Sequence, residues 1–309
     1  MSKKNIYKGI ILAIIATIVW SGNFIVARGV IKQIPPVNLA FYRWLTGTLI
    51  MLPIAWKKFH AEWPLIRANT KYLFWVSISG ITLYNTFLYV AGHHVPAINL
   101  ALRATTTSPI MVIVMAAVFL KEKITWLRFA GLMLCIAGVL LLLSRGDLDR
   151  LLGFRFTTGD WWILLGALCF AVYNTLVKRK PAGLSPTSFL LAVFAFGTLM
   201  LLPAFVWETA ISEPVHFDLK LIGIILYLGA GACVISYLCW NEAIAILGSA
   251  RTALFGNLIP IFSTFEAVLI LGEEITDIHI ISGLIVIVGL VLCNLTIKRK
   301  VAASQIISQ

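Results

Sequence analysis

Glu266 is an acidic residue inside a long apolar run, residues 249–271, where a charged group is costly. It stands six residues before Gly272, which in a helix rising about 1.5 Å per residue is roughly 9 Å from the end of the run. Apolar surroundings favour the protonated form of a carboxyl group, so we predict either a proton-coupling group or a site for a cationic amine. Two structural hypotheses stand beside these: a buried pair, for example with Arg43, or a side chain that reaches the outer interface of a membrane.

Two arginines also lie inside apolar runs. Arg43 stands seven residues after Pro36, and Arg103 stands six residues before Pro109. Either guanidinium group can hold a substrate carboxylate through paired hydrogen bonds. Arg103 falls near the end of its run, so extension of its side chain toward the membrane surface is an equal alternative.

Amide and aromatic side chains form the third group of candidates. Asn23 and Asn174 lie 151 residues apart, and buried amides of this kind bind a substrate or bridge helices. Trp20 lies one helical turn before Asn23, on nearly the same face, and Tyr173 directly precedes Asn174. An aromatic-lined cavity suits amino acids, aromatic metabolites or amines, whereas packing and an interfacial belt are the structural alternatives. The remaining candidates for substrate binding are Tyr84, Asn85, Tyr237, Trp240 and Asn257.

The chain lacks the motifs of common catalytic sites. Neither H-E-x-x-H nor G-x-S-x-G occurs, and no histidines cluster with acids. Its five cysteines lie inside apolar runs and form no C-x-x-C pair, so they are predicted to pack as small apolar side chains. We therefore expect no enzymatic activity, no catalytic residue, no cofactor and no metal site.

The composition is that of a membrane protein. Of 309 residues, 60% are hydrophobic and 12% are charged, and the mean hydropathy is +0.94. A soluble domain carries roughly 25% charged residues, so this chain cannot cover a water-facing surface. The net charge of +12 is assigned to cytoplasmic loops, because no basic stripe is interleaved with aromatics as nucleic-acid binding would require.

Continuous apolar runs of about 20 residues predict transmembrane helices rather than a barrel, and thus an all-α integral membrane protein. The runs are separated by short charged linkers. Ten spans are expected, at 8–28, 36–56, 72–92, 97–119, 126–144, 160–178, 186–206, 219–241, 249–271 and 277–297.

An internal repeat divides the chain into halves. Residues 99–138 match residues 250–289 at an offset of 151, which places Pro109 on Pro260. Both prolines leave a helix carbonyl unpaired and can bend the helix, which would suit gating, with packing as the alternative. Five spans per half is an odd number, so the second half must be inverted in the membrane.

The predicted organisation is a first repeat over residues 1–148, a second, inverted repeat over 156–300, and a cytoplasmic tail over 301–309. Most lysines and arginines of the loops fall on the side of the two termini. Positive residues gather on the cytoplasmic side, so both termini are expected there, in a multi-pass cell (inner or plasma) membrane protein.

Ordered motifs in both halves resemble one transporter family. The first span contains VWSGNFIVAR, which is similar to the W-G-x-N-F-x-x-x-K opening of the EamA-type drug/metabolite transporters, with Arg28 where lysine is commoner. The second span contains PPVNLAFYRW, whose Arg43 matches an arginine of that family. The turns KEKIT and EEIT, each followed by a glycine-containing apolar run, resemble its E-x-[LIV]-T pattern. The resemblance covers nearly the whole chain.

This resemblance implies ten helices in two inverted five-helix repeats. It also implies that spans one, three, four, six, eight and nine line a central cavity, that five and ten are peripheral, and that Arg43 is a structural tie. The expected function is secondary transport of a small metabolite, such as an amino acid or amine, in the export direction by alternating access. An uncoupled facilitator or exchanger of another solute class is the alternative, and a membrane-embedded enzyme a more distant one. The expected partners are the substrate, the bilayer and a coupling proton or ion; substrate identity and oligomeric state stay open.

Overall fold

The computed structural model describes residues 3–30, 33–94, 97–144, 146–147, 157–271 and 275–294. Within these ranges the protein is built from helices joined by short connections, with no strand. Each expected span coincides with one helix or with consecutive helical segments, and the ends differ by less than two turns. The short helix α3 lies in a linker for which no helix was predicted.

The first half of the chain gives seven α-helices among the described residues: α1 (Lys3–Val30), α2 (Pro36–Ala61), α3 (Trp63–Ala68), α4 (Thr70–Ser77), α5 (Tyr84–His94), α6 (Ala97–Leu120) and α7 (Trp126–Ser144). The second half gives α9 (Thr158–Lys178), α10 (Pro186–Ile211), α11 (Leu219–Tyr227), α12 (Ser236–Leu247), α13 (Ser249–Leu254), α14 (Leu258–Leu271) and α15 (Asp277–Asn294).

Local sequence fixes several of these helix starts. Pro36 and Pro186 occupy the first position of α2 and α10, where the fixed φ of proline suits the first turn and its missing N–H is not needed. Ser185 caps α10 and Asp218 caps α11, each accepting a backbone N–H hydrogen bond, of 3.3 and 2.7 Å.

In the described part of the chain, three non-α segments interrupt the helices. The π-helical segment η1 (Ile78–Leu83) joins α4 to α5, and η2 (Leu228–Ile235) joins α11 to α12. When the first segment is shifted by the repeat offset of 151 residues, it falls within the second. The two halves therefore share a π-helical segment that hydropathy does not predict. A 3-10 turn, η3 (Phe255–Asn257), separates α13 from α14.

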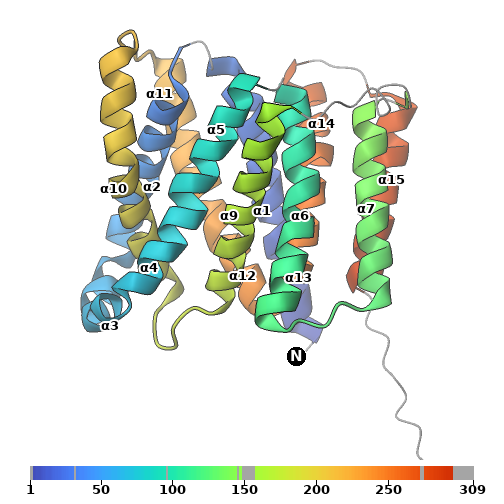
Figure 1. The fold of residues 1–309 in the computed structure, drawn as a ribbon, viewed down its shortest axis with the longest axis horizontal. Coiled ribbons are helices and arrows are strands. Elements are labelled where there is room, and N and C mark those ends of the chain that lie inside the picture. The colour runs from blue at the N-terminus through green and yellow to red at the C-terminus, as the bar shows by residue number, and fades with distance from the viewer. Residues whose placement is uncertain are drawn as a thin grey trace, which may run out of the picture.

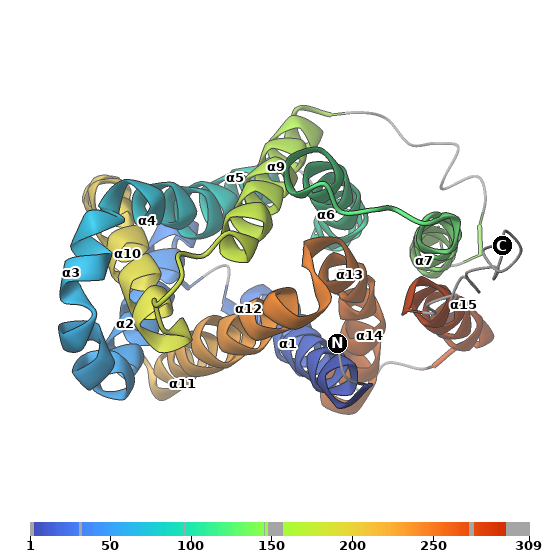
Figure 2. The same ribbon diagram turned by 90° about the horizontal axis from the view of Figure 1, so that it is seen from below.

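Corresponding helices of the two halves have corresponding neighbours. Helix α1 packs on α12 and α14, whereas its counterpart α9 packs on α5 and α6, the counterparts of α12 and α14. Helix α2 packs on α10 and α7 packs on α15, so in both pairs a helix meets its own counterpart. Figures 1 and 2 show α7 and α15 together at one end of the bundle and α2 and α10 toward the other.

Small residues allow α7 and α15 to approach closely. A Cβ added to Gly131 would lie 2.4 Å from the carbonyl oxygen of Gly289, and one added to Gly138 would lie 2.9 Å from that of Ser282. Such backbone contacts through glycine are typical of helix pairs in membranes. The pair therefore forms a compact unit beside the central helices, as the resemblance implied for spans five and ten.

Five helical stretches in the described part of the chain are long and apolar enough to cross a membrane. They are Lys4–Asn23, Thr158–Lys178, Pro186–Ile211, Leu219–Leu247 and Asp277–Asn294. Large apolar side chains are exposed along α15, among them Leu284, Val288 and Val291. An apolar outer surface of this kind is stable in lipid.

Candidate functional site

Five aromatic side chains meet where α1, α9 and α12 cross. The ring of Trp20 lies 5.0 Å from that of Trp240 and 5.6 Å from that of Tyr237, measured between centroids. Tyr173 lies 5.6 Å from Tyr237, and Phe170 lies 6.1 Å from Trp240. We call this set of five residues the aromatic cluster. Sequence reasoning selected four of its members and missed Phe170, which nothing distinguished from other apolar residues.

Two asparagines bind the polar edges of the aromatic cluster. The indole N–H of Trp240 donates to Asn174 Oδ1 at 2.9 Å, and the hydroxyl of Tyr173 donates to Asn241 Oδ1 at 2.8 Å. The Nδ2 atom of Asn241 is buried and has no hydrogen-bond partner within the described structure. Buried polar groups are nearly always paired, so this N–H group is a candidate donor for a further hydrogen bond.

The π-helical segments supply acceptors to the same cluster. Tyr237 donates to the carbonyl oxygen of Gly80 in η1 at 3.2 Å, and Trp20 donates to that of Ala232 in η2 at 2.9 Å. A π-helical turn shifts the register of the backbone hydrogen bonds, which makes carbonyl groups available to side chains. The irregular segments of both halves thus help to position the cluster.

Gly80 also sets the space available to the cluster. A Cβ at this position would lie 2.1 Å from Cδ2 of Tyr173, which is fully buried. Tyr84, at the start of α5, extends the aromatic surface, with its ring 5.0 Å from that of Phe170. Asn23, one turn beyond Trp20 on α1, is half-buried.

Arg43 is engaged by a neighbouring helix rather than by Glu266. Its Nη2 donates to Asn85 Oδ1 at 2.8 Å, and Asn85 Nδ2 donates to the carbonyl of Ile81 at 2.5 Å. The guanidinium carbon also lies 5.2 Å from the centroid of the Trp44 ring. Pairing of Glu266 with Arg43 was therefore wrong, and the geometry supports a structural role for Arg43 between α2 and α5.

Glu266 instead joins α14 to α1. Its Oε1 lies 2.7 Å from Ser21 Oγ, and Ser263 Oγ donates to the carbonyl of Ser21 at 3.1 Å. The Oε2 atom is buried without a hydrogen-bond partner in the described residues. The acid is thus in contact with the first span, a partner that the sequence did not indicate.

The other candidates are more dispersed. Asn257 is fully buried in η3, where its Nδ2 donates to the carbonyl of Leu254 at 3.0 Å. Pro109 lies within the unbroken α6, whereas Pro260 follows the 3-10 turn at the start of α14, so the two halves differ here. The Arg103 side chain lies outside the described residues.

Hydrogen bonds join neighbouring helices at the end of the bundle near the N-terminus (Figure 1). Glu122, just after α6, accepts backbone N–H bonds from Ser249 at 3.0 Å and Ala250 at 3.2 Å. Lys178 donates to the carbonyls of Ile244 and Ala245, at 3.2 and 3.0 Å. These contacts join the end of α6 to α13, and α9 to α12.

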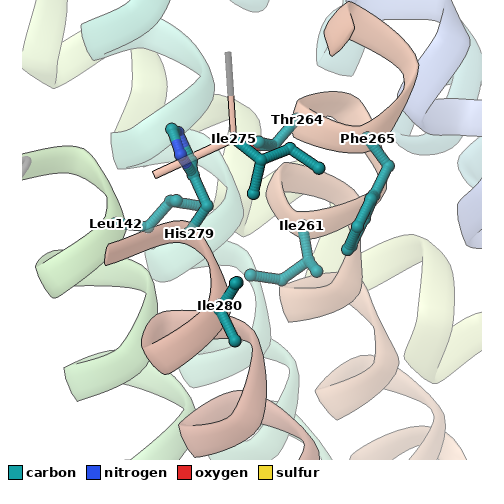
Figure 3. Close-up of a pocket in the computed structure, with 7 residues that line it drawn as sticks. All are labelled: Leu142, Ile261, Thr264, Phe265, Ile275, His279 and Ile280. Atoms are coloured by element: carbon teal, nitrogen blue, oxygen red, sulfur yellow. The ribbon is translucent and has the colours of Figure 1, made fainter. Parts of the chain in front are cut away.

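A small apolar hollow lies elsewhere, between α7, α14 and α15 (Figure 3). Its lining residues are Leu142, Ile261, Thr264, Phe265, Ile275, His279 and Ile280. None belongs to the aromatic cluster. Among the described residues no group of three or more His, Cys, Asp or Glu side chains is placed to hold a metal ion.

A model of the EamA-like transporter family matches this chain twice, over residues 7–144 and 157–295. The chain belongs to the EamA-like transporter family. It is accordingly a multi-pass membrane protein with two EamA-like units, and it is a member of a family of transporters rather than of enzymes.

Two relatives of this EamA-like protein carry names that refer to export of amino-acid compounds. A protein of Streptantibioticus cattleyicolor named "Probable terminal-alkyne amino-acid exporter" is 29% identical over 73% of this chain and 74% of its own length. A "Probable amino-acid metabolite efflux pump" of Escherichia coli is 24% identical over 91% and 92%. A solved structure, titled "Crystal structure of protein", shares the fold, with a TM-score of 0.74, 18% identity and coverage of 93% and 96%.

The Glu122 contacts of this EamA-like transporter give a first test of the geometry. In Glu122→Gln one side-chain oxygen is replaced by an NH₂ group, which cannot accept a backbone N–H bond. Loss of a helix cap costs about 0.5–2 kcal/mol, so we expect a lower midpoint of thermal unfolding in detergent. Glu213→Gln, at an exposed loop position, is the matched control. Equal midpoints for the two variants would show that the Glu122 contacts contribute nothing.

Proposed function

We propose that this protein is a secondary transporter that exports an amino acid or a related small amine or metabolite. The observation that carries the proposal is the aromatic cluster with its buried amides, which lies where helices of both halves meet. Aromatic faces bind apolar and cationic parts of a solute, and amides bind its polar groups. The names of the two relatives above support export of amino-acid compounds.

The proposed mechanism is alternating access between two inverted repeats of five membrane-spanning helices each, residues 1–148 and 156–300. Helix α1 packs on α12 and α14, and its counterpart α9 packs on their counterparts, α5 and α6. This correspondence supports the symmetry. Transporters with inverted repeats bind solute near the midplane and alternate between two related conformations. The Glu122 and Lys178 contacts, which join helices near the N-terminus, would have to break for this end to open.

Within this mechanism, we assign solute binding to Trp20, Tyr173, Asn174, Tyr237 and Trp240. Tyr84, which borders the cluster, is a secondary candidate. The other secondary candidates are Asn23, Asn85, Arg103 and Asn257, because the described geometry gives them other partners or does not place them in the cluster. Glu266 is assigned to coupling by a proton, and Arg43, Pro109 and Pro260 to structure and gating.

The decisive experiment is solute flux in liposomes that contain the purified protein. We expect efflux or exchange of an amino acid or organic amine in a screen of labelled metabolites, against protein-free liposomes as the control. Flux only of an unrelated solute class, without dependence on a proton gradient, would favour the facilitator or exchanger. Lipid modification without any flux would exclude a transporter.

The proposed location is the cell membrane, with both termini on the cytoplasmic side. The loop lysines and arginines on the side of the termini support this orientation. A reporter that is active only in the cytoplasm, fused after Gln309, is expected to be active. Activity of a reporter that requires the opposite compartment would reverse the orientation.

A further inference from the structure

Helix α1 has an apolar stripe that faces outward from the bundle. Ile11, Ile15 and Ile18 are exposed, and their spacing of four and three residues places them on one helix face. The next position on this face is Gly22, one turn further on. Trp20 lies two residues before Gly22, about 200° around the helix, and so points away from this stripe into the aromatic cluster.

Tyr227 and Glu266 cover the stripe at Gly22. A Cβ on this glycine would lie 2.3 Å from Tyr227 Oη and 3.5 Å from Glu266 Oε2. Neighbours of Glu266 on α14 point outward as well, with Phe265 49% and Leu269 84% exposed. The carboxyl group therefore lies in the seam between α1, α11 and α14 on the membrane-facing side, and not in the aromatic cluster.

The two hydrogen bonds at Ser21 Oγ need one more hydrogen than the serine supplies, and a protonated Glu266 would supply it. Ser21 Oγ lies 2.5 Å from the carbonyl oxygen of Ile18 and 2.7 Å from Glu266 Oε1. Serine has one hydroxyl hydrogen, and a carbonyl oxygen has none to donate. Both distances are those of O–H···O hydrogen bonds, and Ser21 has a hydrogen for only one of them, so the other bond needs a hydrogen from its partner. The second hydrogen must belong to the carboxyl group.

The second carboxyl oxygen of Glu266 independently indicates that the acid is protonated. Glu266 Oε2 is buried without a hydrogen-bond donor among the described residues. Tyr227 is the titratable group that faces it from α11, and its hydroxyl hydrogen is donated to the carbonyl of Val19 at 3.0 Å. His279 of α15 lies toward Thr264 and Phe265 in the hollow of Figure 3, and the described parts of α1 and α14 bring no other charged group to the seam. An unpaired carboxylate oxygen here would be far costlier than a neutral acid.

We infer that Glu266 is a proton-binding site that is occupied in this conformation, and that its neutral carboxyl group holds α14 against α1 by donating to Ser21. Release of the proton breaks the O–H bond, leaves the electron pair on the carboxylate and transfers H⁺ to water. The anion can accept from Ser21 at one oxygen only, and the described residues offer no donor to Oε2, so proton release favours separation of α1 from α14. This inference deepens the proposed function, because it names the residue and the helix contact through which a proton would act.

Infrared spectroscopy tests the proton directly. The full-length protein in phosphatidylcholine vesicles at neutral pH, without any solute, is expected to show the C=O stretching band of a protonated carboxylic acid. The band should shift in D₂O, disappear in Glu266→Gln and persist in Glu208→Gln, whose native carboxylate accepts two N–H bonds from Asn38. Absence of the band from the wild type, or its persistence in Glu266→Gln, would overturn the inference.

A second pair of variants tests the contact without removing the acid. Ser21→Ala removes the acceptor, so the carboxylic acid band is expected to move to the frequency of an acid with one hydrogen bond fewer. Ser263→Ala removes only a bond to the backbone of Ser21 and should leave the band in place. An unmoved band in Ser21→Ala would contradict donation to Ser21. Neither infrared measurement involves solute flux. Both therefore test the protonation of Glu266 even if the protein does not export amino acids.

Discussion

Replacing Gly80 with alanine is expected to lower the rate of solute transport at least tenfold. The added methyl group would lie 2.1 Å from Cδ2 of Tyr173, a distance at which one of the two groups must move. Tyr173 is fully buried and its hydroxyl is bound to Asn241, so its ring cannot move without breaking that bond and displacing the cluster. Overpacking of this kind costs about 1–3 kcal/mol, and a tenfold change in rate corresponds to about 1.4 kcal/mol.

The matched control for this variant is Gly223→Ala in α11. A Cβ at Gly223 meets no heavy atom within 4 Å, so transport and thermal stability should stay at wild-type values. Both variants are assayed in liposomes, with the midpoint of thermal unfolding measured in parallel to separate altered binding from loss of fold. Wild-type transport by Gly80→Ala would show that the position of the Tyr173 ring does not matter for solute binding.

The helices of this protein could be located from hydropathy because their length and composition are set locally. A span that crosses lipid must be apolar over about 20 residues, and proline and glycine mark its ends. The span expected at 126–144 coincides with α7, and that expected at 97–119 differs from α6 by one residue. The duplication was predicted from shared residues alone. It agrees with the packing, because corresponding helices of the two halves have corresponding neighbours.

The π-helical segments η1 and η2 could not be predicted in this way. A π turn has the same apolar composition as the helix around it, and what stabilises it here is distant in sequence. The carbonyl of Gly80 accepts from Tyr237, 157 residues away, and that of Ala232 accepts from Trp20, 212 residues away. Such contacts depend on how the helices are rotated against each other, which hydropathy does not specify.

The same limit applies to the candidate site. Residue type selected Trp20, Tyr173, Asn174, Tyr237 and Trp240, and the structure brings these five together. Their partners were not predicted, and the pairing of Glu266 with Arg43 was wrong, because opposite charge says nothing about depth or helix face. Both residues are bound instead by short polar side chains, Ser21 and Asn85. Asn85 was selected as a candidate for substrate binding, not as a partner of Arg43, and Ser21 was not selected at all.

Replacing Glu266 with glutamine is expected to remove the pH dependence of transport and to lower flux driven by a proton gradient at least tenfold. Glutamine is neutral at every pH, and its NH₂ group can donate to Ser21 Oγ as a protonated carboxyl group does. The variant therefore imitates the proton-loaded acid permanently and keeps α14 against α1. The rate is measured in liposomes over a range of internal and external pH, with the wild type and Glu213→Gln in parallel.

The direction of the effect distinguishes coupling from simple loss of a contact. If Glu266 only stabilised the seam, Glu266→Gln would retain a normal pH profile, since the amide preserves the contact, and Glu266→Ala would lose stability without a change in profile. If the proton on Glu266 controls separation of α1 from α14, both variants lose the pH dependence, but only Glu266→Gln retains wild-type thermal stability. A normal pH profile in Glu266→Gln would therefore remove this residue from the coupling mechanism, whatever its effect on stability.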